Sequence, residues 1–464
     1  MPEKTAKKAA KKVPIKKTSK KAGASKKQAA KTVKPKKVAQ KTAAPVTKTS
    51  ATKGDTLVQP VMNIGLVGHV DHGKTTLTER LSGKWTDTHS EEIKRGITIR
   101  LGYADCVFYR IPGKTGPEQY TTKAMDAETK RANEAIIKVS FVDAPGHESL
   151  MATMLSGATI MDGAILLIAA NEACPQPQTR EHLMALEIAG ITKLVVVQNK
   201  VDVVSSERAQ RNHQQIKEFL KGTPYEEAPI VPISAQRGVN IDVLIETMLA
   251  VFIPPERDPR AEPMMVVARS FDINKPGAKA KQLQGGVIGG ALKAGVLKNG
   301  DTIEIRPGRI VEEANKLKAK PLTTTIRGLV TGGQKVEQVT PGGSIAVMTL
   351  LDHAIVKGDL LTGSVVGHPG KLPPIWDEFL LEPTLLERVV GSQQDLKVNP
   401  LTPNEILMLN VNSAATVGIV TDLKKGRVRC RLKKPICATL GSRVTISRRV
   451  GNRFRLIGYG VIKE

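Results

Sequence analysis

The sequence predicts an α/β domain with a doubly wound, mostly parallel sheet, followed by two β-barrels and preceded by a disordered basic tail. Three observations support this fold class. Apolar strand patterns alternate with longer helical patterns from Pro60 to Pro254. A glycine-rich loop directly follows the first of these strands. After Met264 only short β-branched runs and glycine turns remain, which is typical of barrels.

The composition excludes several classes of protein. The 464 residues contain no run of about 18 uninterrupted apolar residues, which argues against a membrane span. The Lys-rich N-terminus has no apolar core of the kind that a secretory signal needs. The 4 cysteines include no CxxC pair, which argues against a disulfide scaffold and a cysteine-rich zinc site. We therefore expect a reduced, cytoplasmic protein without membrane contact.

The positive charge is concentrated at the two ends of the chain. Residues 1–53 hold 18 lysines and one acidic residue, with no Arg, Leu or aromatic residue. So few apolar side chains cannot offset the entropy lost on ordering, so we predict that residues 1–57 are a disordered tail. The tail either attracts nucleic-acid phosphates or is simply solvated. Residues 400–464 hold 13 basic and 3 acidic residues, and the rest of the chain is nearly neutral.

Residues 58–255 carry the pattern of the α/β domain. Short apolar strands alternating with helices indicate a parallel sheet covered on both faces. The predicted strands are Met62–Val67, Val139–Val142, Ala164–Ala169, Leu194–Gln198 and Ile230–Ile233. The predicted helices are Lys74–Leu81, Glu148–Gly157, Gln178–Ala189, Ser205–Lys221 and Ile241–Phe252. Closely spaced prolines from Pro254 to Pro263 then end the last helix and form a linker.

The rest of the chain is predicted to form two barrels, residues 256–371 and 372–464, with a break at Pro373-Pro374. Strand patterns in the first are Met265–Arg269, Gly286–Gly289, Asp301–Arg306 and Ser344–Met348. Those in the second are Glu405–Val411, Val417–Val420, Arg427–Leu432 and Arg443–Ser447.

The most specific motif is the loop after the first strand. It reads Gly68-His69-Val70-Asp71-His72-Gly73-Lys74-Thr75 and fits the phosphate-binding pattern GxxxxGK[ST]. Backbone N–H groups of such a loop, with the N-terminus of the following helix, bind phosphate oxygens. We predict that Lys74 reaches the β- and γ-phosphates and that the Thr75 hydroxyl ligates Mg²⁺.

A second motif, Asn199-Lys200-Val201-Asp202, indicates which base is bound. A carboxylate at Asp202 can accept hydrogen bonds from both N1–H and the N2 amino group of guanine. Adenine lacks this donor pair and would leave the carboxylate unpaired. We expect Asn199 to hold the purine edge and the neighbouring loops, and the Lys200 stem to lie along the base. Ser234-Ala235 can offer a backbone N–H to guanine O6.

A third motif, Asp143-Ala144-Pro145-Gly146-His147, ends another apolar strand. We predict that Asp143 binds Mg²⁺ through water and that the Gly146 N–H senses the γ-phosphate. His147 is the candidate for orienting the attacking water, although a surface histidine at a helix start is the simpler alternative. Thr98, in Arg95-Gly96-Ile97-Thr98, supplies a second hydroxyl for Mg²⁺. The polar loop before it, residues 83–98, has the character of an order–disorder switch.

Taken together, VGHVDHGKTT, RGIT, DAPGH, NKVD and SAQ followed by two barrels resemble the translational GTPases of the elongation factor Tu type. Longer stretches are similar to the gamma subunit of archaeal and eukaryotic translation initiation factor two; they are residues 268–277, 361–367, 446–451 and 456–460. The resemblance covers about residues 60–464. It implies a P-loop GTPase domain that hydrolyses GTP to GDP, in a heterotrimer with alpha and beta subunits. It also implies that the GTP form carries methionylated initiator tRNA to the small ribosomal subunit.

The resemblance also implies roles for individual residues. GTP or GDP would be bound by Asp71, His72, Gly73, Lys74, Thr75, Thr76, Gly146, Asn199, Lys200, Val201, Asp202, Ser234, Ala235 and Gln236. Thr75 and Thr98 would ligate one Mg²⁺, and Asp71 and Gly96 lie near a second. Val70 and Ile97 would form an apolar gate around the water that His147 positions.

The chain departs from the family between Thr98 and Asp143. Family members usually carry a cysteine zinc knuckle there, but this insertion contains only Cys106. One thiolate cannot make a tetrahedral zinc site, so we predict no zinc. We expect the insertion, Tyr109–Ala135, to be polar with a helix-like segment at Ala124–Ile136, and we assign it no role.

Two alternatives remain open from the sequence. An elongation-type or selenocysteine-specific carrier would share the GTP site and differ in the tRNA bound, but the selenocysteine factor is expected to have an additional C-terminal domain. A nucleic-acid structural protein is suggested by the tail alone. A separate hypothesis concerns the strand at Arg427–Leu432, where Arg427, Arg429 and Arg431 fall on one face. That face either contacts RNA phosphates or is ordinary solvated surface.

Overall fold

The computed structural model describes residues 57–464 except 88–89, 96–97, 275–283, 315, 391–395, 425 and 452. The predicted tail, up to residue 56, therefore lies outside the described residues, as do the candidate residues Gly96 and Ile97. Within the described ranges, no helix is long and apolar enough to cross a membrane.

The first domain is built on a seven-stranded mixed sheet in the order β3-β2-β4-β1-β5-β6-β7. The parallel strands β4, β1, β5, β6 and β7 confirm the mostly parallel sheet. Their bounds are Asn63–Gly68 (β1), Glu134–Asp143 (β4), Gly163–Ala169 (β5), Leu194–Asn199 (β6) and Ile230–Pro232 (β7). Sequence patterns did not predict the two antiparallel strands at one edge, β2 (Gly102–Arg110) and β3 (Tyr120–Thr121).

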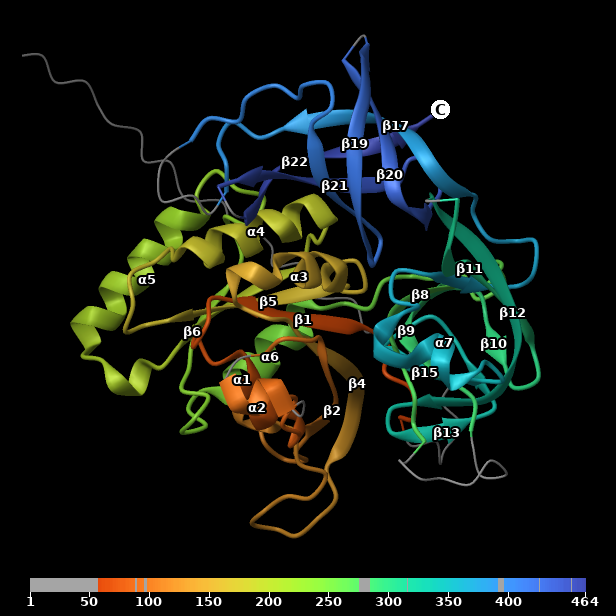
Figure 1. The fold of residues 1–464 in the computed structure, drawn as a ribbon. Coiled ribbons are helices and arrows are strands. Elements are labelled where there is room, and N and C mark those ends of the chain that lie inside the picture. The colour runs from red at the N-terminus through yellow and green to blue at the C-terminus, as the bar shows by residue number, and fades with distance from the viewer. Residues whose placement is uncertain are drawn as a thin grey trace, which may run out of the picture. The chain divides into compact units, whose positions relative to one another are not determined.

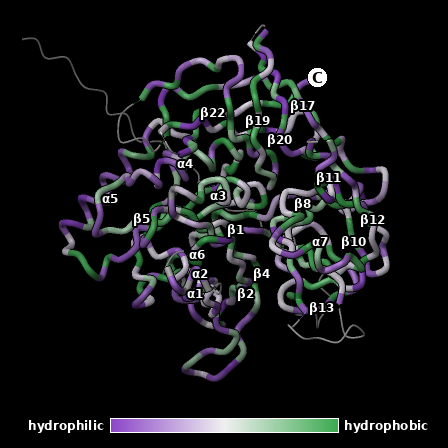
Figure 2. The backbone as a smooth tube through the Cα atoms, in the orientation of Figure 1, coloured by the Kyte–Doolittle hydropathy of each residue, from purple (hydrophilic) through white to green (hydrophobic). Residues whose placement is uncertain are grey.

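Helices cover both faces of this sheet (Figure 1). On one face, α3 (Met151–Ala158), α4 (Pro177–Ala189) and α5 (Ser206–Leu220) bury side chains such as Met154, Leu186 and Ile216 in one core. On the other, α1 (Lys74–Ser82) and α6 (Ile241–Val251) bury Leu77 and Leu244 in a second core. The outward side of α5 is hydrophilic, as Figure 2 shows in purple. A short helix, α2 (Ser90–Arg95), occurs in the predicted switch loop.

The prediction of a helix at Ala124–Ile136 is wrong. The segment forms a loop whose two sides are bridged at Met125 and Ala132, and β4 begins at Glu134. Asp126 explains the difference, because its Oδ1 accepts hydrogen bonds from the N–H groups of Glu128 (3.0 Å) and Thr129 (2.6 Å). Side-chain bonds of this kind compete with the helical backbone pattern.

The second domain is a barrel whose strands run in the order β11-β16-β8-β9-β15-β12 and close through pairing of β11 with β12. The strands are β8 (Met264–Phe271), β9 (Val287–Ala294), β11 (Thr302–Glu313), β12 (Lys316–Thr331), β15 (Ser344–Thr349) and β16 (Val365–Gly367). Smaller elements extend it: β10 (Leu297–Lys298), β13 (Gln334–Val336), β14 (Gln338–Val339) and α7 (His353–Val356).

The third domain is a closed barrel in the order β17-β20-β19-β18-β21-β22. Its strands are β17 (Ile375–Leu385), β18 (Ile406–Val411), β19 (Ala414–Lys424), β20 (Arg427–Cys437), β21 (Arg443–Val450) and β22 (Arg453–Lys463). Two successive barrels confirm the predicted fold class. The predicted domain boundaries themselves stay predictions.

Candidate nucleotide-binding site

The phosphate loop, residues 68–75, connects β1 to α1 and can be formed only with glycine at Gly73. That residue has φ 91°, and a Cβ there would lie 2.4 Å from Nδ2 of Asn199. Asp71 also has a positive φ of 60°. The loop therefore turns sharply against the base-binding motif before α1 begins at Lys74, as predicted from its sequence.

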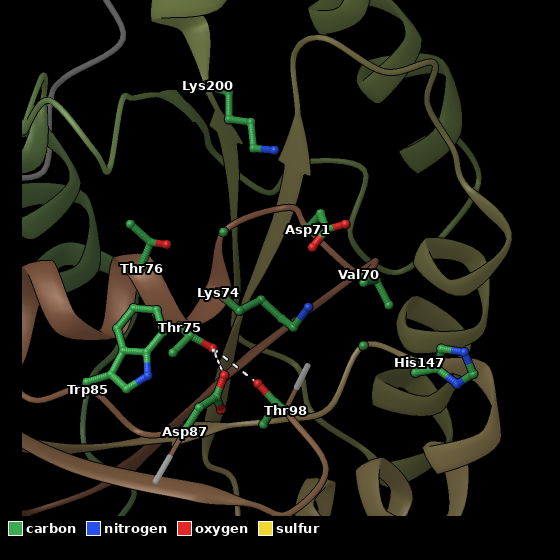
Figure 3. A pocket seen from close by; sticks show the side chains of 12 residues that line it. Val70, Asp71, Lys74, Thr75, Thr76, Trp85, Asp87, Thr98, His147 and Lys200 are labelled. Atoms are coloured by element: carbon green, nitrogen blue, oxygen red, sulfur yellow. Dashed lines mark hydrogen bonds between the residues drawn. The ribbon is translucent and has the colours of Figure 1, made fainter. Parts of the chain in front are cut away.

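A cavity of about 490 Å³ opens beside this loop (Figure 3). It brings together residues from four separate segments of the chain. The lining residues are Val70, Asp71, Gly73, Lys74, Thr75, Thr76, Trp85, Asp87, Thr98, Gly146, His147 and Lys200. Ten of these twelve are residues that the sequence identified as candidates; Trp85 and Asp87 are additional. We call the region around Lys74, Thr75, Asp87 and Asp143 the phosphate side.

On the phosphate side, hydroxyl groups converge on the buried carboxylate of Asp143. Thr75 Oγ1 donates to Asp143 Oδ2 at 2.8 Å, and Thr86 Oγ1 donates to the same oxygen at 2.7 Å. Thr98 Oγ1 lies 3.2 Å from Thr75 Oγ1. Asp143 Oδ1 is buried without a hydrogen-bond partner, and burial raises the pKa of this carboxyl to about 6. A buried, unsatisfied carboxylate oxygen beside two threonine hydroxyls suits a hard cation such as Mg²⁺.

Asp87 is a second carboxylate at this point that sequence reasoning missed. Its Oδ2 lies 3.5 Å from Thr75 Oγ1, its Oδ1 is buried and unpartnered, and burial raises its pKa. The sequence pattern predicts no fixed structure for the switch loop, so Asp87 could not be placed. The only signal was a hydroxyl next to a carboxylate, Thr86-Asp87, in a polar segment. Within the described residues, no group of three His, Cys, Asp or Glu side chains could hold a metal by themselves. A Mg²⁺ ion at this point would therefore be held by carboxylate, hydroxyl and water oxygens together.

The cation of Lys74 is buried beside these carboxylates. Its Nζ donates to His69 O at 2.7 Å, and burial lowers its pKa to about 8. Gly146 packs directly against it, because a Cβ there would lie 2.5 Å from Lys74 Nζ and 2.9 Å from Gly68 O. The glycine of the third motif is thus required by close approach to the phosphate loop.

His147 lines the cavity but lies apart from Lys74 and Thr75 in Figure 3. Its Nδ1 is engaged at the start of a short helix, 2.8 Å from Ser149 Oγ and 3.3 Å from Ser149 N. Val70 also lies on the cavity wall. The water-orienting role of His147 and the gate formed by Val70 stay predictions.

The base side, defined as residues 199–202 and 234–237, is held together by hydrogen bonds of its own. Asn199 Nδ2 donates to His72 O at 2.9 Å, and Asn199 Oδ1 accepts from Ala235 N at 3.0 Å. This amide therefore joins the phosphate loop to the loop at residues 234–237. Arg80 of α1, which sequence reasoning missed, donates to Ala235 O at 2.8 Å and to Gln236 O at 2.5 Å. No short motif contains Arg80, and only the fold brings it to this loop.

Of the residues predicted to bind the nucleotide, seven do not line the cavity: His72, Asn199, Val201, Asp202, Ser234, Ala235 and Gln236. Lys200 lines it and has a positive φ of 63°, whereas Asp202 faces Arg237, with 3.9 Å between Oδ2 and Nε. Ser234 Oγ accepts from Arg237 N at 3.1 Å. The His72 side chain is buried and engages Leu167 O through Nδ1 at 2.9 Å, so only its backbone faces the base side. Val201 donates its N–H to Ile233 O at 3.3 Å.

A phosphate loop, a hydroxyl–carboxylate cluster and a base-binding loop on one mixed sheet, followed by two barrels, define a translational GTPase. Residues 59–254 match the family model described as the elongation factor Tu GTP binding domain. Residues 377–462 match the model described as initiation factor eIF2 gamma, C terminal.

The chain is similar over most of its length to proteins named translation initiation factor 2 subunit gamma. It is 55% identical to the one from Pyrococcus horikoshii over 407 residues, covering 88% of this chain and 98% of that protein. It is 58% identical to the one from Methanothermobacter thermautotrophicus over 405 residues, covering 87% and 99%. The chain therefore belongs to the family of translation initiation factor 2 gamma subunits.

Among solved structures, the fold is similar to that of a bacterial selenocysteine-specific elongation factor. That match has a TM-score of 0.66 and 24% identity, covering 87% of this chain and 58% of the other. The elongation factor SelB from Methanococcus maripaludis, in complex with the GTP analogue GPPNHP, matches with a TM-score of 0.62 and 22% identity, covering 88% and 80%. These likenesses concern the fold.

Proposed function

We propose that this initiation factor is a GTP-dependent carrier of methionylated initiator tRNA to the small ribosomal subunit, acting in the cytoplasm with alpha and beta subunits. The observation that carries the proposal is the coincidence of two features in one chain. The cavity is lined by the phosphate loop and by Lys200 of the Asn199–Asp202 motif, and relatives named for the gamma subunit match along 98% of their length.

The residues of the cavity have distinct roles in this proposal. The backbone N–H groups of residues 71–76 and the Lys74 cation bind the phosphates, while Asp202 reads the guanine edge. Thr75 and Thr98 would hold Mg²⁺ directly, and Asp143 would hold it through water. When bound, Mg²⁺ would supply positive charge that offsets the negative charge of the phosphates. A second Mg²⁺ would lie near Asp71.

Hydrolysis of GTP to GDP and phosphate would use His147 to orient the attacking water. Its imidazole must turn from its contact with Ser149 toward the phosphate side before it can do so. Val70 would exclude other water from this point. The proposal therefore predicts slow hydrolysis in the isolated chain and faster hydrolysis in the ribosomal complex, which would reposition this side chain.

The experiment that tests the carrier role compares tRNAs on the purified full chain with GTP and Mg²⁺. We expect methionylated initiator tRNA to bind at least about tenfold more tightly than methionylated elongator tRNA, and the difference to shrink with GDP. Equal binding of the two tRNAs would contradict the proposal and favour an elongation-type carrier. A separate experiment, co-purification from the native source, would show whether alpha and beta subunits accompany the chain.

The basic face of β20 is a candidate RNA-contact surface. Arg427, Arg429 and Arg431 are exposed and alternate with buried Val428, Cys430 and Leu432, which confirms the predicted alternation. Glu378 of β17 lies 3.2 Å from Arg429 and 3.7 Å from Arg431, so the face carries less net charge than its arginines alone suggest. Gln replacements at all three arginines, in a chain without residues 1–53, should flatten the salt dependence of RNA binding by about one log–log unit for each phosphate that is no longer neutralised. An unchanged slope would leave this face as solvated surface.

A further inference from the structure

The segment that follows Thr98 is anchored at its far end by the rest of the fold. Leu101 is buried in the same core as α3, where a Cβ on Gly157 would lie 2.6 Å from Leu101 Cδ2. Its carbonyl oxygen accepts a hydrogen bond from Arg269 Nη1 of β8 at 3.2 Å. Leu101 is therefore a fixed point, three residues after the hydroxyl that faces the cavity.

Glu92 of α2 holds the two peptides between Thr98 and Leu101. Its Oε1 accepts hydrogen bonds from the N–H of Ile99 at 3.1 Å and from the N–H of Arg100 at 2.9 Å. Glu92 is buried, with an exposed fraction of 4%. A single carboxylate oxygen that accepts from two successive N–H groups restricts both peptide planes, and hydrogen bonds to a charged acceptor are the stronger kind. We call this arrangement the Glu92 clamp.

The clamp restricts where the Thr98 side chain can point. The Ile99 N–H belongs to the peptide that begins at the Thr98 carbonyl, so the clamp limits rotation of that peptide about the Thr98 Cα. Thr98 is buried, and a β-branched side chain has few allowed rotamers. The orientation of the backbone therefore sets the position of the hydroxyl, which lies 3.2 Å from Thr75 Oγ1 and close to Asp87 (Figure 3).

The charges around Glu92 favour a role at the cation site. A buried carboxylate is costly, and this one lies near a second carboxylate. Burial raises the pKa of Asp87, and the negative charge of Glu92 adds to this effect. A carboxylate that only closed a loop would gain nothing from such repulsion, whereas a bound cation would relieve it. Glu92 is not among the residues that line the cavity, so its route to the cation is through Thr98.

We propose that Glu92 is a positioning residue for Mg²⁺ binding: by holding the two N–H groups of the clamp, it keeps the Thr98 hydroxyl beside Thr75. Loss of the clamp would free the Thr98 backbone while Leu101 stays anchored in the core. The effect would then be confined to the phosphate side. This inference rests on the proposed role of Thr98 as a Mg²⁺ ligand.

The first test measures the clamp itself, in the full chain without nucleotide. Glu92→Leu keeps the bulk of the side chain but removes the acceptor, whereas Glu92→Gln keeps Oε1. We expect hydrogen exchange at the Ile99 and Arg100 N–H groups to be at least about tenfold faster in the Leu variant and within about threefold of the unchanged chain in the Gln variant. Lys94→Met, at an exposed residue of the same helix, is the matched control and should change nothing. Unchanged exchange with Leu, or equal exchange with Leu and Gln, would overturn the clamp.

The second test asks whether the clamp acts on Mg²⁺ through Thr98. Mg²⁺ is titrated calorimetrically into the complex of each full-length chain with a non-hydrolysable GTP analogue. We expect Glu92→Leu to weaken Mg²⁺ binding about tenfold and Glu92→Gln to recover most of the loss. In a Thr98→Val chain, which has already lost the hydroxyl, Glu92→Leu should add nothing. Glu92→Ala should match Glu92→Leu, which separates the loss of the acceptor from a packing defect caused by the leucine.

The outcomes distinguish the inference from the proposal on which it rests. Undiminished Mg²⁺ affinity in Thr98→Val would contradict the ligand role of Thr98 and the inference with it. A loss in Thr98→Val without one in Glu92→Leu, or additive losses in the double variant, would overturn the positioning role of Glu92 alone.

Discussion

On the phosphate side of the cavity, buried charged groups keep unsatisfied atoms, whereas on the base side the loops satisfy one another. Asp143 and Asp87 each leave one oxygen without a partner. Burial raises the pKa of both carboxyls and lowers the pKa of Lys74, so it favours the uncharged form of each group. Asn199 and Arg80, by contrast, already bridge the base-side loops. We therefore expect bound ligands to stabilise the phosphate side, and we expect the base side to be formed before guanine binds.

The largest expected effect is on base selectivity, which we predict to depend mainly on Asp202. Asp202→Asn should weaken GTP binding by about 10³-fold and improve binding of xanthosine triphosphate, whose position 2 carries an oxygen. Competition against a fluorescent guanine nucleotide measures both affinities. Because the loops are held by Asn199 and Arg80, the fold of the base side should survive. Equal losses for the two nucleotides would mean that the loop collapsed.

The next effect concerns His147 on the phosphate side. His147→Ala should lower ribosome-stimulated hydrolysis by about 10²-fold while leaving GDP affinity nearly unchanged. Asn at this position is the control, because it retains an acceptor for the Ser149 N–H but lacks a distal ring nitrogen. We expect the Asn variant to be as slow as the Ala variant. Recovery of the rate with Asn would reduce His147 to a helix cap.

A tenfold effect is expected from the pH dependence of Mg²⁺ binding. The folded pKa of Asp143, about 6, lies above its ordinary value of 3.8. In the ligand-free chain this group stabilises the fold fully below that ordinary value, and the contribution is lost as pH rises through about 6. Mg²⁺ needs the carboxylate, so its affinity for the GDP complex should fall about tenfold from pH 7 to pH 5. Asp143→Asn should retain only the pH dependence of the phosphate groups; an identical profile in the variant would rule out Asp143 as the titrating group.

The smallest effect is expected on the base side, where several hydrogen bonds hold the same loops together. Arg80→Met removes the donors to Ala235 O and Gln236 O but leaves Asn199 in place. GDP dissociation should therefore rise only about fivefold, and Arg80→Lys should recover part of the loss. A loss of guanine selectivity as large as that of Asp202→Asn would show that the base side is not preformed.

Residues that are contiguous in a motif were predictable from the sequence, because a loop of fixed length places its own side chains. Lys74, Thr75, Gly146 and Lys200 line the cavity for this reason. Asp87 and Arg80 were missed because neither belongs to a motif and each reaches its partners only through the folding of the chain. Neither spacing nor periodicity contains that information.

The edge of the sheet, strand β2 and the insertion after it, was also not predicted correctly from the sequence. In β2 the side chains of Ala104, Cys106 and Phe108 are buried at period two, a pattern present in the sequence but obscured by the polar insertion after it. The helix expected at Ala124–Ile136 failed because Asp126 bonds to nearby N–H groups, and alanine-rich composition cannot reveal such bonds. Within the described residues, Cys106 Sγ donates to Leu81 O and is buried, so this cysteine packs under the sheet edge.

Hydrogen–deuterium exchange with and without GDP and Mg²⁺ tests the difference between the two sides most directly. We predict that ligand binding strongly protects the N–H groups of residues 70–76, 86–87 and 98, which the ligand itself must order. Protection at residues 199–202 and 234–237 should be nearly the same in both states. Equal gains of protection on the base side would contradict the account, because they would show that guanine forms that side on binding.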